Sequence, residues 1–335
     1  MFSTTASTGG IDVPRPAAPR KIPATPVLVP RQGVASSDRE ASGLLGALGP
    51  APVHAGAKAW LLSRFRPICL AKLTAGSAML ERLDNKYVVH LSVLQHAAEF
   101  LTEHFDILEI EGKRAFTYET CYFDDAQRTC YFEHHQGRRQ RCKIRVRKYT
   151  DAQSCFVEVK LKDKRGHTIK KRLEYPVDKY RTLDQRAMAH IQGSYADLYE
   201  RELMGALKPV LDISYQRFTL AAKNGGERIT IDTGLVFSGD GQSYAINDSL
   251  FIVETKSANG NGIADKVLRR LHQHPIGNCS KYCLGTALLQ MVDKYNKFLP
   301  ALRKVGAVLG AQRTVKAIRD SSDDTREPCG SPAVP

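Results

Sequence analysis

The sequence predicts an α+β fold in which a large antiparallel sheet closes, or nearly closes, into a β-tunnel with flanking helices. Charged residues stand at every second position of five short stretches, and most residues between them are apolar, which is typical of strands with two unlike faces. An open sheet with one strongly basic face would suffer like-charge repulsion, whereas a closed sheet directs these charges at a ligand in its lumen. The five stretches are Arg82 to Lys86, Lys143 to Arg147, Glu158 to Lys162, Lys170 to Arg172 and Glu254 to Lys256.

Strands follow one another along most of the chain, with turn residues such as Asp124-Asp125 and Asn224-Gly225-Gly226 between them. Short connections join neighbouring strands in opposite directions, so the sheet is expected to be antiparallel. Strands are expected at 82–89, 115–123, 129–134, 141–149, 154–162, 168–174, 212–221, 227–237 and 249–256.

Other segments have the apolar spacing of helices. Between Val93 and Leu101 the apolar residues recur at the interval that places them on one helix face. The pair Lys208-Pro209 marks the boundary between a helix and a second group of strands, because the residue before a proline disfavours the helical conformation. Helices are expected at 92–105, 184–206, 263–271 and 280–298.

The chain divides into four parts by composition. Residues 1–57 are rich in Pro, Ala, Gly, Ser and Thr and are expected to be a disordered tail. Residues 58–79 form a helical or irregular lead-in, in which Trp60 and Phe65 alternate with basic residues; it either docks on the domain or lies on a membrane surface. Residues 80–300 make the tunnel domain, and 301–335 form a C-terminal extension that is disordered at its end.

Composition narrows the partners and the compartment. The 335 residues are 42% hydrophobic, enough for a packed core, and the net charge of +14 favours an anionic partner: nucleic acid, a phosphorylated small molecule, polyphosphate or a membrane surface. Eight cysteines without a framework spacing, and no secretory signal, indicate reduced thiols and a cytoplasmic protein. No run of about 18 apolar residues occurs, so any membrane association would be peripheral, through the surface itself or through a membrane-protein partner.

The charged face has the chemistry of a phosphate site with a metal ion. The planar fork of Arg binds two phosphate oxygens at once, and Lys adds a compact charge. Carboxylates have no reason to face phosphate unless a cation lies between them. Glu158 and Glu254, with Asp84 or Glu119 as further candidates, are therefore expected to hold Mg²⁺ or Mn²⁺.

At these stretches the chain resembles the VTC domain family of polyphosphate polymerases, within the CYTH-like triphosphate tunnel metalloenzymes. The resemblance covers roughly residues 80–290 and rests on the order of many short basic strands. The matching stretches are Arg82 to Val88, Cys121 to Asp124, Lys143 to Arg147, Phe156 to Lys160, Thr168 to Arg172, Arg228 to Asp232, Ile252 to Lys256 and Ser280 to Tyr282.

The resemblance implies a tunnel of about eight strands that transfers the γ-phosphoryl group of ATP to a growing polyphosphate chain, with Mn²⁺ or Mg²⁺ as cofactor. It implies phosphate contacts for Lys86, Arg145, Arg147, Lys160, Lys170, Arg217 and Lys281, and a metal ligand at Glu254. Together with the charge pattern, the predicted site comprises the catalytic residues Arg145, Arg147 and Lys160, the phosphate-binding residues Arg82, Lys86, Lys143, Lys162, Lys170, Arg172, Arg217, Lys256 and Lys281, and the metal ligands Glu254 and Glu158.

The chain departs from the related patterns at two positions. The tunnel phosphatases open with Glu-x-Glu-x-Lys, but here Arg82 replaces the first carboxylate, which favours polymerase over hydrolase. Asn278 stands where the polymerase pattern has a further Lys. Two alternatives remain: a triphosphatase or polyphosphatase of the same fold, and a non-catalytic module that binds polyphosphate or inositol phosphate.

Three further patterns have simpler interpretations. Seven basic residues between Arg138 and Lys148 resemble a nucleic-acid patch, but the chain has no helix-turn-helix or zinc-finger pattern. His272, His274, Cys279 and Cys283 are too irregularly spaced for a zinc site, and the two cysteines fit a helix face as core residues. The aromatic residues of 122–132 are expected to pack in the core and at its rim.

Overall fold

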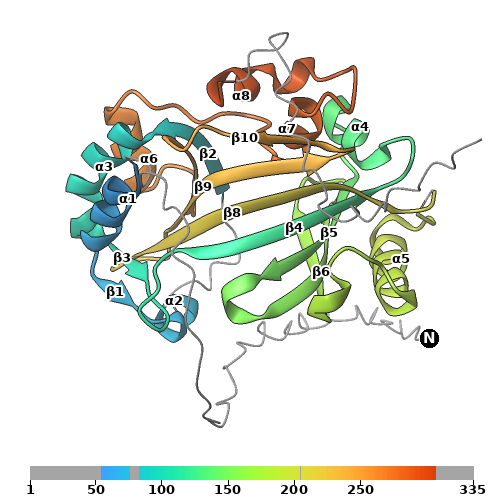
Figure 1. Cartoon of the computed structure of the whole chain (residues 1–335), viewed down its shortest axis with the longest axis horizontal. Helices are drawn as coiled ribbons and strands as arrows, with labels where there is room; N and C mark the ends of the chain where they lie inside the picture. Colours follow the sequence, from blue (N-terminus) through green and yellow to red (C-terminus); the bar gives the residue numbers. More distant parts are fainter. Residues whose placement is uncertain (1–53, 76–82, 204, 307–335) are drawn as a thin grey trace, which may run out of the picture. The chain divides into compact units, whose positions relative to one another are not determined.

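A curved antiparallel sheet organises the structure, a computed structural model that describes residues 54–75, 83–203 and 205–306. Eight strands form a continuous path in which each strand is antiparallel to its neighbours (Figure 1). In path order they are β2 (Leu83–His90), β11 (Leu250–Ser257), β9 (Arg228–Gly239), β8 (Lys208–Ala222), β4 (Phe116–Asp124), β5 (Arg141–Tyr149), β6 (Ser154–Lys162) and β7 (Thr168–Tyr175). Three short strands join the sheet beside this path: β1 (Pro67–Ile68), β3 (Phe105–Leu108) and β10 (Gln242–Ala245).

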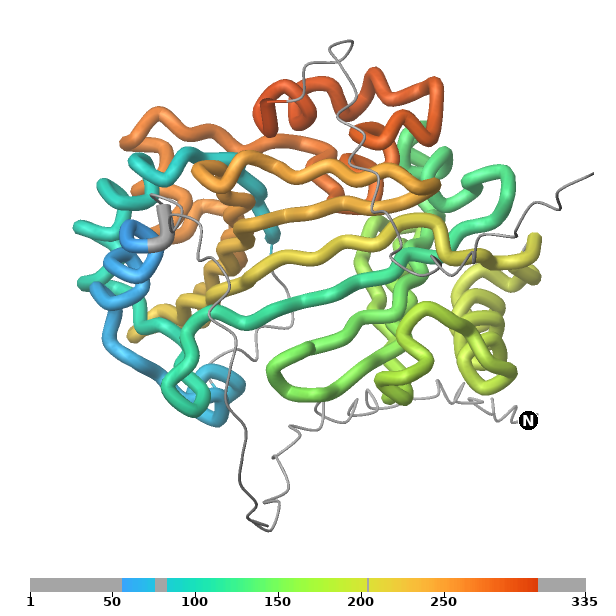
Figure 2. Tube along the Cα trace, viewed as in Figure 1, coloured from blue at the N-terminus to red at the C-terminus, as the bar shows by residue number. Residues whose placement is uncertain are grey.

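The path curves so that its two halves face each other. Figure 2 shows β2 beside β11, far later in the chain, and Lys86 on β2 is the register partner of Glu254 on β11. Both residues act electrostatically on Lys160 of β6, which lies at the other half of the path. The end strands β2 and β7 are not paired with each other in the described residues, so hydrogen bonds do not close the sheet. The predicted α+β fold with a nearly closed antiparallel tunnel is confirmed.

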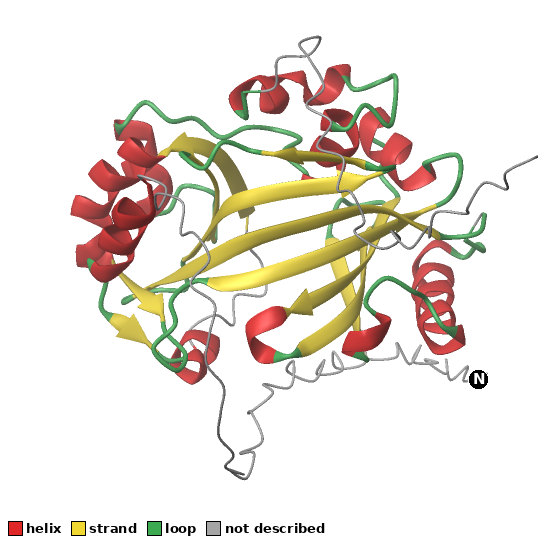
Figure 3. Ribbon diagram, viewed as in Figure 1, coloured by secondary structure: helices red, strands yellow, loops and turns green. Residues whose placement is uncertain are grey.

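Helices cover the outer faces of the two halves (Figure 3). One apolar core joins α1 (His54–Ser63), α3 (Leu91–His104) and α6 (Ile263–Arg270) to the strands around β2 and β11. A larger core joins α4 (Thr129–Gln136), α5 (Gln185–Tyr199), α7 (Lys281–Leu288) and α8 (Leu299–Lys304) to the strands around β5 and β6. Helix α2 (Leu70–Ala75) packs near β3, and short 3₁₀ helices lie at Thr150–Ala152, Val177–Lys179 and Asn296–Phe298.

The alternation predicted from sequence produces the two faces. On β5 and β6, the apolar residues between the charged ones are fully buried in the larger core: Ile144, Val146, Val157, Val159 and Leu161. Each such side chain gains about 1.5–3 kcal/mol from leaving water, which fixes the register and turns the charged positions to the opposite face. The position of the charged face is therefore set by burial of the apolar one.

An extra residue in β9 adjusts which side chains face the lumen. On β8 and β9, Arg217 pairs with Asp232, and Ile213 pairs with Phe237. Four residues separate the two positions on β8 and five separate them on β9, so the register shifts by one residue between these pairs. Gly234 lies in this stretch with a φ of 60°, a conformation that glycine adopts without steric cost. The shift lets Asp232 reach Arg217 while Phe237 packs in the core.

Several predicted elements were wrong in type or length. The segment 129–134 is not a strand but the start of α4, because the buried carboxylate of Asp124 accepts hydrogen bonds from the backbone of Cys130 and Tyr131 at 3.0 and 3.1 Å. The helix predicted at 184–206 ends at Tyr199, where Glu200 adopts a left-handed φ of 55°. The helix predicted at 280–298 ends at Leu288.

The predicted lead-in docks on the domain. Leu61 and Phe65 are buried in the core around α3, while Trp60 remains 42% exposed. Most of the predicted N-terminal tail and C-terminal extension lies outside the described residues. No helix in the described ranges is long and apolar enough to cross a membrane.

Candidate active site

The lumen has a first wall in which cations are matched by carboxylates. Lys86 lies 3.5 Å from Glu254, and Lys256 contacts both Glu254 and Asp84, the latter at 3.4 Å. On β8 and β9, Asp232 accepts two hydrogen bonds from Arg217 at 2.6 and 2.8 Å. We define the first wall as the lumen-facing residues of β2, β11, β9 and β8 with one residue of α7: Asp84, Lys86, Arg217, Asp232, Glu254, Lys256 and Lys281.

Two carboxylates of the first wall, Glu254 and Asp232, stay ionised although they are largely buried. Burial acts to raise the pKa of Glu254, but Lys256 and Lys86 outweigh it and hold that pKa well below its usual range. Burial likewise opposes ionisation of Asp232, and Arg217 and Lys281 outweigh it, so its pKa is lowered. Each buried negative charge on this wall is thus stabilised by the cations around it.

The second wall is built around one buried carboxylate. Glu158 is 1% exposed and makes ion pairs with Arg145 at 2.6 Å, Lys170 at 2.5 Å and Arg172 at 2.8 Å. Burial acts to raise its pKa, but Arg145 and the neighbouring cations lower it well below the usual range. We define the second wall as the lumen-facing residues of β5, β6 and β7: Lys143, Arg145, Arg147, Glu158, Lys160, Lys162, Lys170 and Arg172.

Four cations of the second wall lack a carboxylate partner among the described residues: Lys143, Arg147, Lys160 and, at the end of β6, Lys162. Arg147 donates from Nε to the hydroxyl of Thr120 at 3.3 Å. Lys160 lies between charged residues of both walls, and its side chain is reached by water. Partial loss of hydration inside the lumen, together with the charge of Lys143, lowers its pKa to about 7. Burial also lowers the pKa of Lys143. A polyanion entering the lumen would relieve this like-charge repulsion.

Aromatic rings hold the guanidinium groups in place. The guanidinium of Arg145 lies 5.8 Å from the ring centre of Tyr122 and donates to its hydroxyl at 3.0 Å. Arg147 lies 5.6 Å from the ring centre of Tyr118. Tyr122 is also 4% exposed and stacks on Tyr282, which confirms its predicted packing role, whereas its contact with Arg145 was not predicted. Such support pre-organises the donors before a ligand binds.

Comparison with known proteins identifies the family. The family model of the VTC domain matches residues 81–290, most of the chain and nearly all of the sheet. The chain belongs to the VTC domain family. No protein of curated function matches it.

Solved structures with a similar fold are distant from this VTC domain. A candidate adenylyl cyclase from Hippeastrum, described as having a dominant triphosphatase activity, is 14% identical with a TM-score of 0.39, over 62% of this chain and 96% of that one. A candidate adenylate cyclase from Bacillus halodurans is 11% identical with a TM-score of 0.36, over 60% of this chain and 95% of that one. Both likenesses are too weak to decide function.

The residues around Glu254 fit a divalent cation that is shared with phosphate. Glu254 and Asp84 both contact the ammonium of Lys256, so a cation already lies between two carboxylates there. Mg²⁺ characteristically takes one or two carboxylates and completes its shell with phosphate oxygens and water. No group of three or more His, Cys, Asp or Glu side chains that could hold a metal occurs among the described residues, so phosphate would have to supply further ligands.

The other proposed metal ligands fit less well. The oxygens of Glu158 are already engaged by three cations. Glu119 is adjacent to the lumen-facing Thr120 on β4 and pairs with Lys148 at 3.2 Å, so it lies on the outer face of the sheet. A metal ion in this VTC domain is therefore best placed at Glu254 and Asp84.

The structure brings most of the predicted site residues together on the two walls. Arg82 lies outside the described residues, and Lys162 lies at the end of β6, where its ammonium donates to the carbonyl of Gly166 at 2.9 Å. Cys279 and Cys283 are buried, which confirms their predicted core role, although only Cys283 lies on a helix, because α7 begins after Cys279. Asp232 was missed as a site residue, although it lies in the predicted strand 227–237 and alternates there with Arg228 and Thr230.

Proposed function

We propose that this VTC domain is a metal-dependent polyphosphate polymerase that transfers the γ-phosphoryl group of ATP to the end of a growing polyphosphate chain. The observation that carries the proposal is a group of three carboxylate-free cations, Lys143, Arg147 and Lys160, beside the pre-organised Arg145. They offer several donors to successive phosphates along one wall of the lumen.

The reaction requires alignment and charge compensation more than covalent chemistry. The bond between the γ-phosphorus and its bridging oxygen breaks, a terminal oxygen of the acceptor chain bonds to that phosphorus, and ADP leaves. Arg145, Arg147 and Lys160 would offset the charge on the transferred oxygens. Since the acceptor oxygen is already ionised, no general base is needed. When bound at Glu254 and Asp84, Mn²⁺ or Mg²⁺ would polarise a phosphoryl oxygen as a Lewis acid.

The carboxylates of the lumen favour transfer over hydrolysis. A hydrolase has to position and deprotonate water, usually with a carboxylate or a metal-bound hydroxide. Here Glu158 and Asp232 are each neutralised by more than one cation at 2.8 Å or less, which makes both poor bases. This supports the polymerase over the triphosphatase alternative.

The test is to incubate the purified chain with ATP and Mn²⁺, with and without a short polyphosphate primer, and to separate the products on a gel stained for polyphosphate. We expect a ladder of long chains that Glu254→Gln abolishes and Glu99→Gln, which changes an exposed carboxylate on α3, preserves. Accumulation of free phosphate without chains would instead establish a triphosphatase. No turnover, with phosphate binding intact, would establish a binding module.

A further inference from the structure

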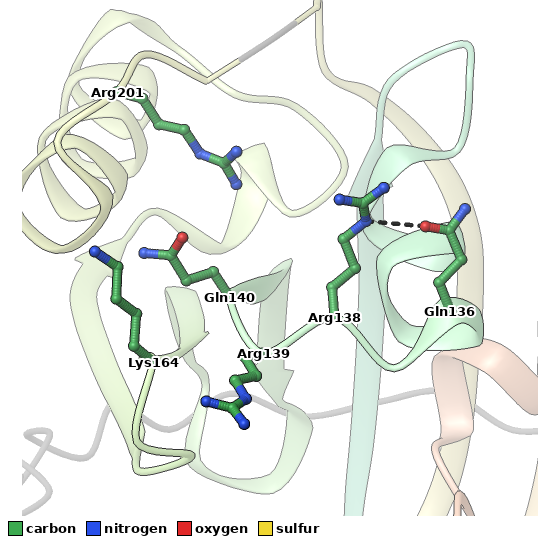
Figure 4. A pocket seen from close by; sticks show the side chains of 6 residues that line it. All are labelled: Gln136, Arg138, Arg139, Gln140, Lys164 and Arg201. Atoms are coloured by element: carbon green, nitrogen blue, oxygen red, sulfur yellow. Dashed lines mark hydrogen bonds between the residues drawn. The ribbon is translucent and has the colours of Figure 1, made fainter.

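A basic pocket lies outside the two walls of the lumen. Its volume is about 490 Å³, within the range of small-ligand sites. Figure 4 shows Arg201 approaching it from one side and the segment 138–140 from the other. It is lined by Gln136, Arg138, Arg139, Gln140, Lys164 and Arg201, none of which is acidic.

The pocket adjoins the end of the second wall. The last register pair of β5 and β6 is Arg141 with Lys162, one step beyond Lys143 with Lys160 on the same face. The guanidinium of Arg141 donates to the carbonyl of Arg138, which lines the pocket. Lys164, another lining residue, follows Lys162 by two positions. Positive charge therefore continues from the lumen, past the strand ends, into the pocket.

Two arginines of the pocket, Arg138 and Arg201, contact neutral side chains. Arg138 donates from Nε to the side-chain oxygen of Gln136 at 2.9 Å. The guanidinium of Arg201 lies 5.5 Å from the ring centres of both Tyr195 and Tyr199.

The pocket has little internal compensation for its charge. In the described residues, Arg201 has one distant ion pair, with Glu133 at 3.5 Å, and neither Arg139 nor Lys164 is ion-paired. These cations are available to an external anion.

We infer that this pocket binds a second segment of a linear inorganic polyphosphate, the part of the chain that lies beyond the lumen. The inference rests on the proposed function, since it takes the lumen to hold the same polyanion. Nucleic acid fits less well, because Tyr195 and Tyr199 are 4% and 6% exposed and offer no free ring face to a base. A chain long enough to occupy both sites would bind more tightly than a short one, because the second contact is intramolecular.

The test compares ligand lengths in one charge-reversed variant. We would measure the affinity of tripolyphosphate, which is short enough for the lumen alone, and of polyphosphate of about a hundred units, both without metal. Arg139→Glu/Lys164→Glu should bind the long chain at least tenfold more weakly and tripolyphosphate as the unchanged protein does. Lys266→Glu/Arg270→Glu on α6, with the same change of net charge at exposed positions, should weaken the two ligands little and equally.

Three results would overturn the inference: no loss of long-chain affinity in the pocket variant, an equal loss for both ligands, or the same length-dependent loss in the α6 variant. Arg139→Gln/Lys164→Gln, checked by thermal unfolding, repeats the comparison if the charge reversal perturbs folding. Failure of the proposed function can be told apart from failure of this inference. If the protein makes no polymer from ATP but the pocket variant still loses affinity for the long chain alone, the pocket binds polyphosphate and only the polymerase proposal is wrong.

Discussion

The first and second walls of the lumen use the same residue types in different ways. On the first wall, each of the four cations lies beside a carboxylate. Glu254 contacts Lys86 and Lys256, Asp84 also contacts Lys256, and Asp232 contacts Arg217 and Lys281. On the second wall, Glu158 orients three cations, and four others have no carboxylate partner among the described residues: Lys143, Arg147, Lys160 and Lys162. Charge alone therefore does not identify a phosphate ligand. What distinguishes the second wall is positive charge that the protein itself does not compensate.

The largest expected effect follows from breaking the centre of the second wall. Glu158→Gln should lower the free energy of unfolding by about 3–5 kcal/mol, because Arg145, Lys170 and Arg172 would lose a buried counter-charge. Urea unfolding measures the loss, and Glu174→Gln on the neighbouring strand is the control. Unchanged stability with weakened Mn²⁺ binding would instead support the metal role that the sequence suggested for Glu158.

Loss of an uncompensated cation should reduce turnover more than stability. Arg147→Ala should lower the kcat for polymer formation roughly 10²–10³-fold, the usual cost of losing one pre-organised donor. Lys148→Ala changes the next residue, which pairs with Glu119 on the outer face, and should leave kcat near that of the unchanged protein. Equal kcat values for the two variants would mean that Arg147 does not contact the reacting phosphate.

The lowered lysine pKa on the second wall predicts proton uptake with the ligand. Lys160, with a pKa of about 7, is largely neutral at pH 8 in the free protein, and a bound polyanion raises that pKa, so the lysine gains a proton. Because only the protonated lysine attracts the anion, affinity for tripolyphosphate should fall as pH rises through 7. Calorimetry at pH 8 in buffers of different ionisation enthalpy measures the uptake, and Lys160→Met should reduce it. Identical uptake by the two proteins would assign the proton elsewhere.

The smallest effect concerns the metal position of the first wall. Lys256→Ala removes the ammonium that contacts both Glu254 and Asp84, so Mn²⁺ affinity should rise several-fold. Lys266→Ala on α6 is the control for a lost surface charge. Weaker Mn²⁺ binding in Lys256→Ala would show that these two carboxylates do not form the metal position.

The sequence predicted the two faces of the sheet but not how charges pair across it. Alternation at Lys143 to Arg147 and Glu158 to Lys162 located both strands and their lumen faces, because the side-chain period of a strand is local. Pairing is non-local: Asp232 meets Lys281 of α7, 49 residues later, and no spacing rule predicts that contact. The same limit explains the error at 129–134, where a strand-like aromatic segment becomes helical because Asp124 accepts its backbone hydrogen bonds.

The most direct test is the affinity of tripolyphosphate, measured by calorimetry at pH 6 without metal, for Lys160→Ala and Glu254→Gln. At this pH Lys160 carries its charge, since its pKa is about 7. If the second wall binds phosphate and the first wall is internally compensated, Lys160→Ala weakens binding at least tenfold, while Glu254→Gln leaves it unchanged or tightens it. Full affinity in Lys160→Ala, or an equal loss in Glu254→Gln, would contradict this division between the walls.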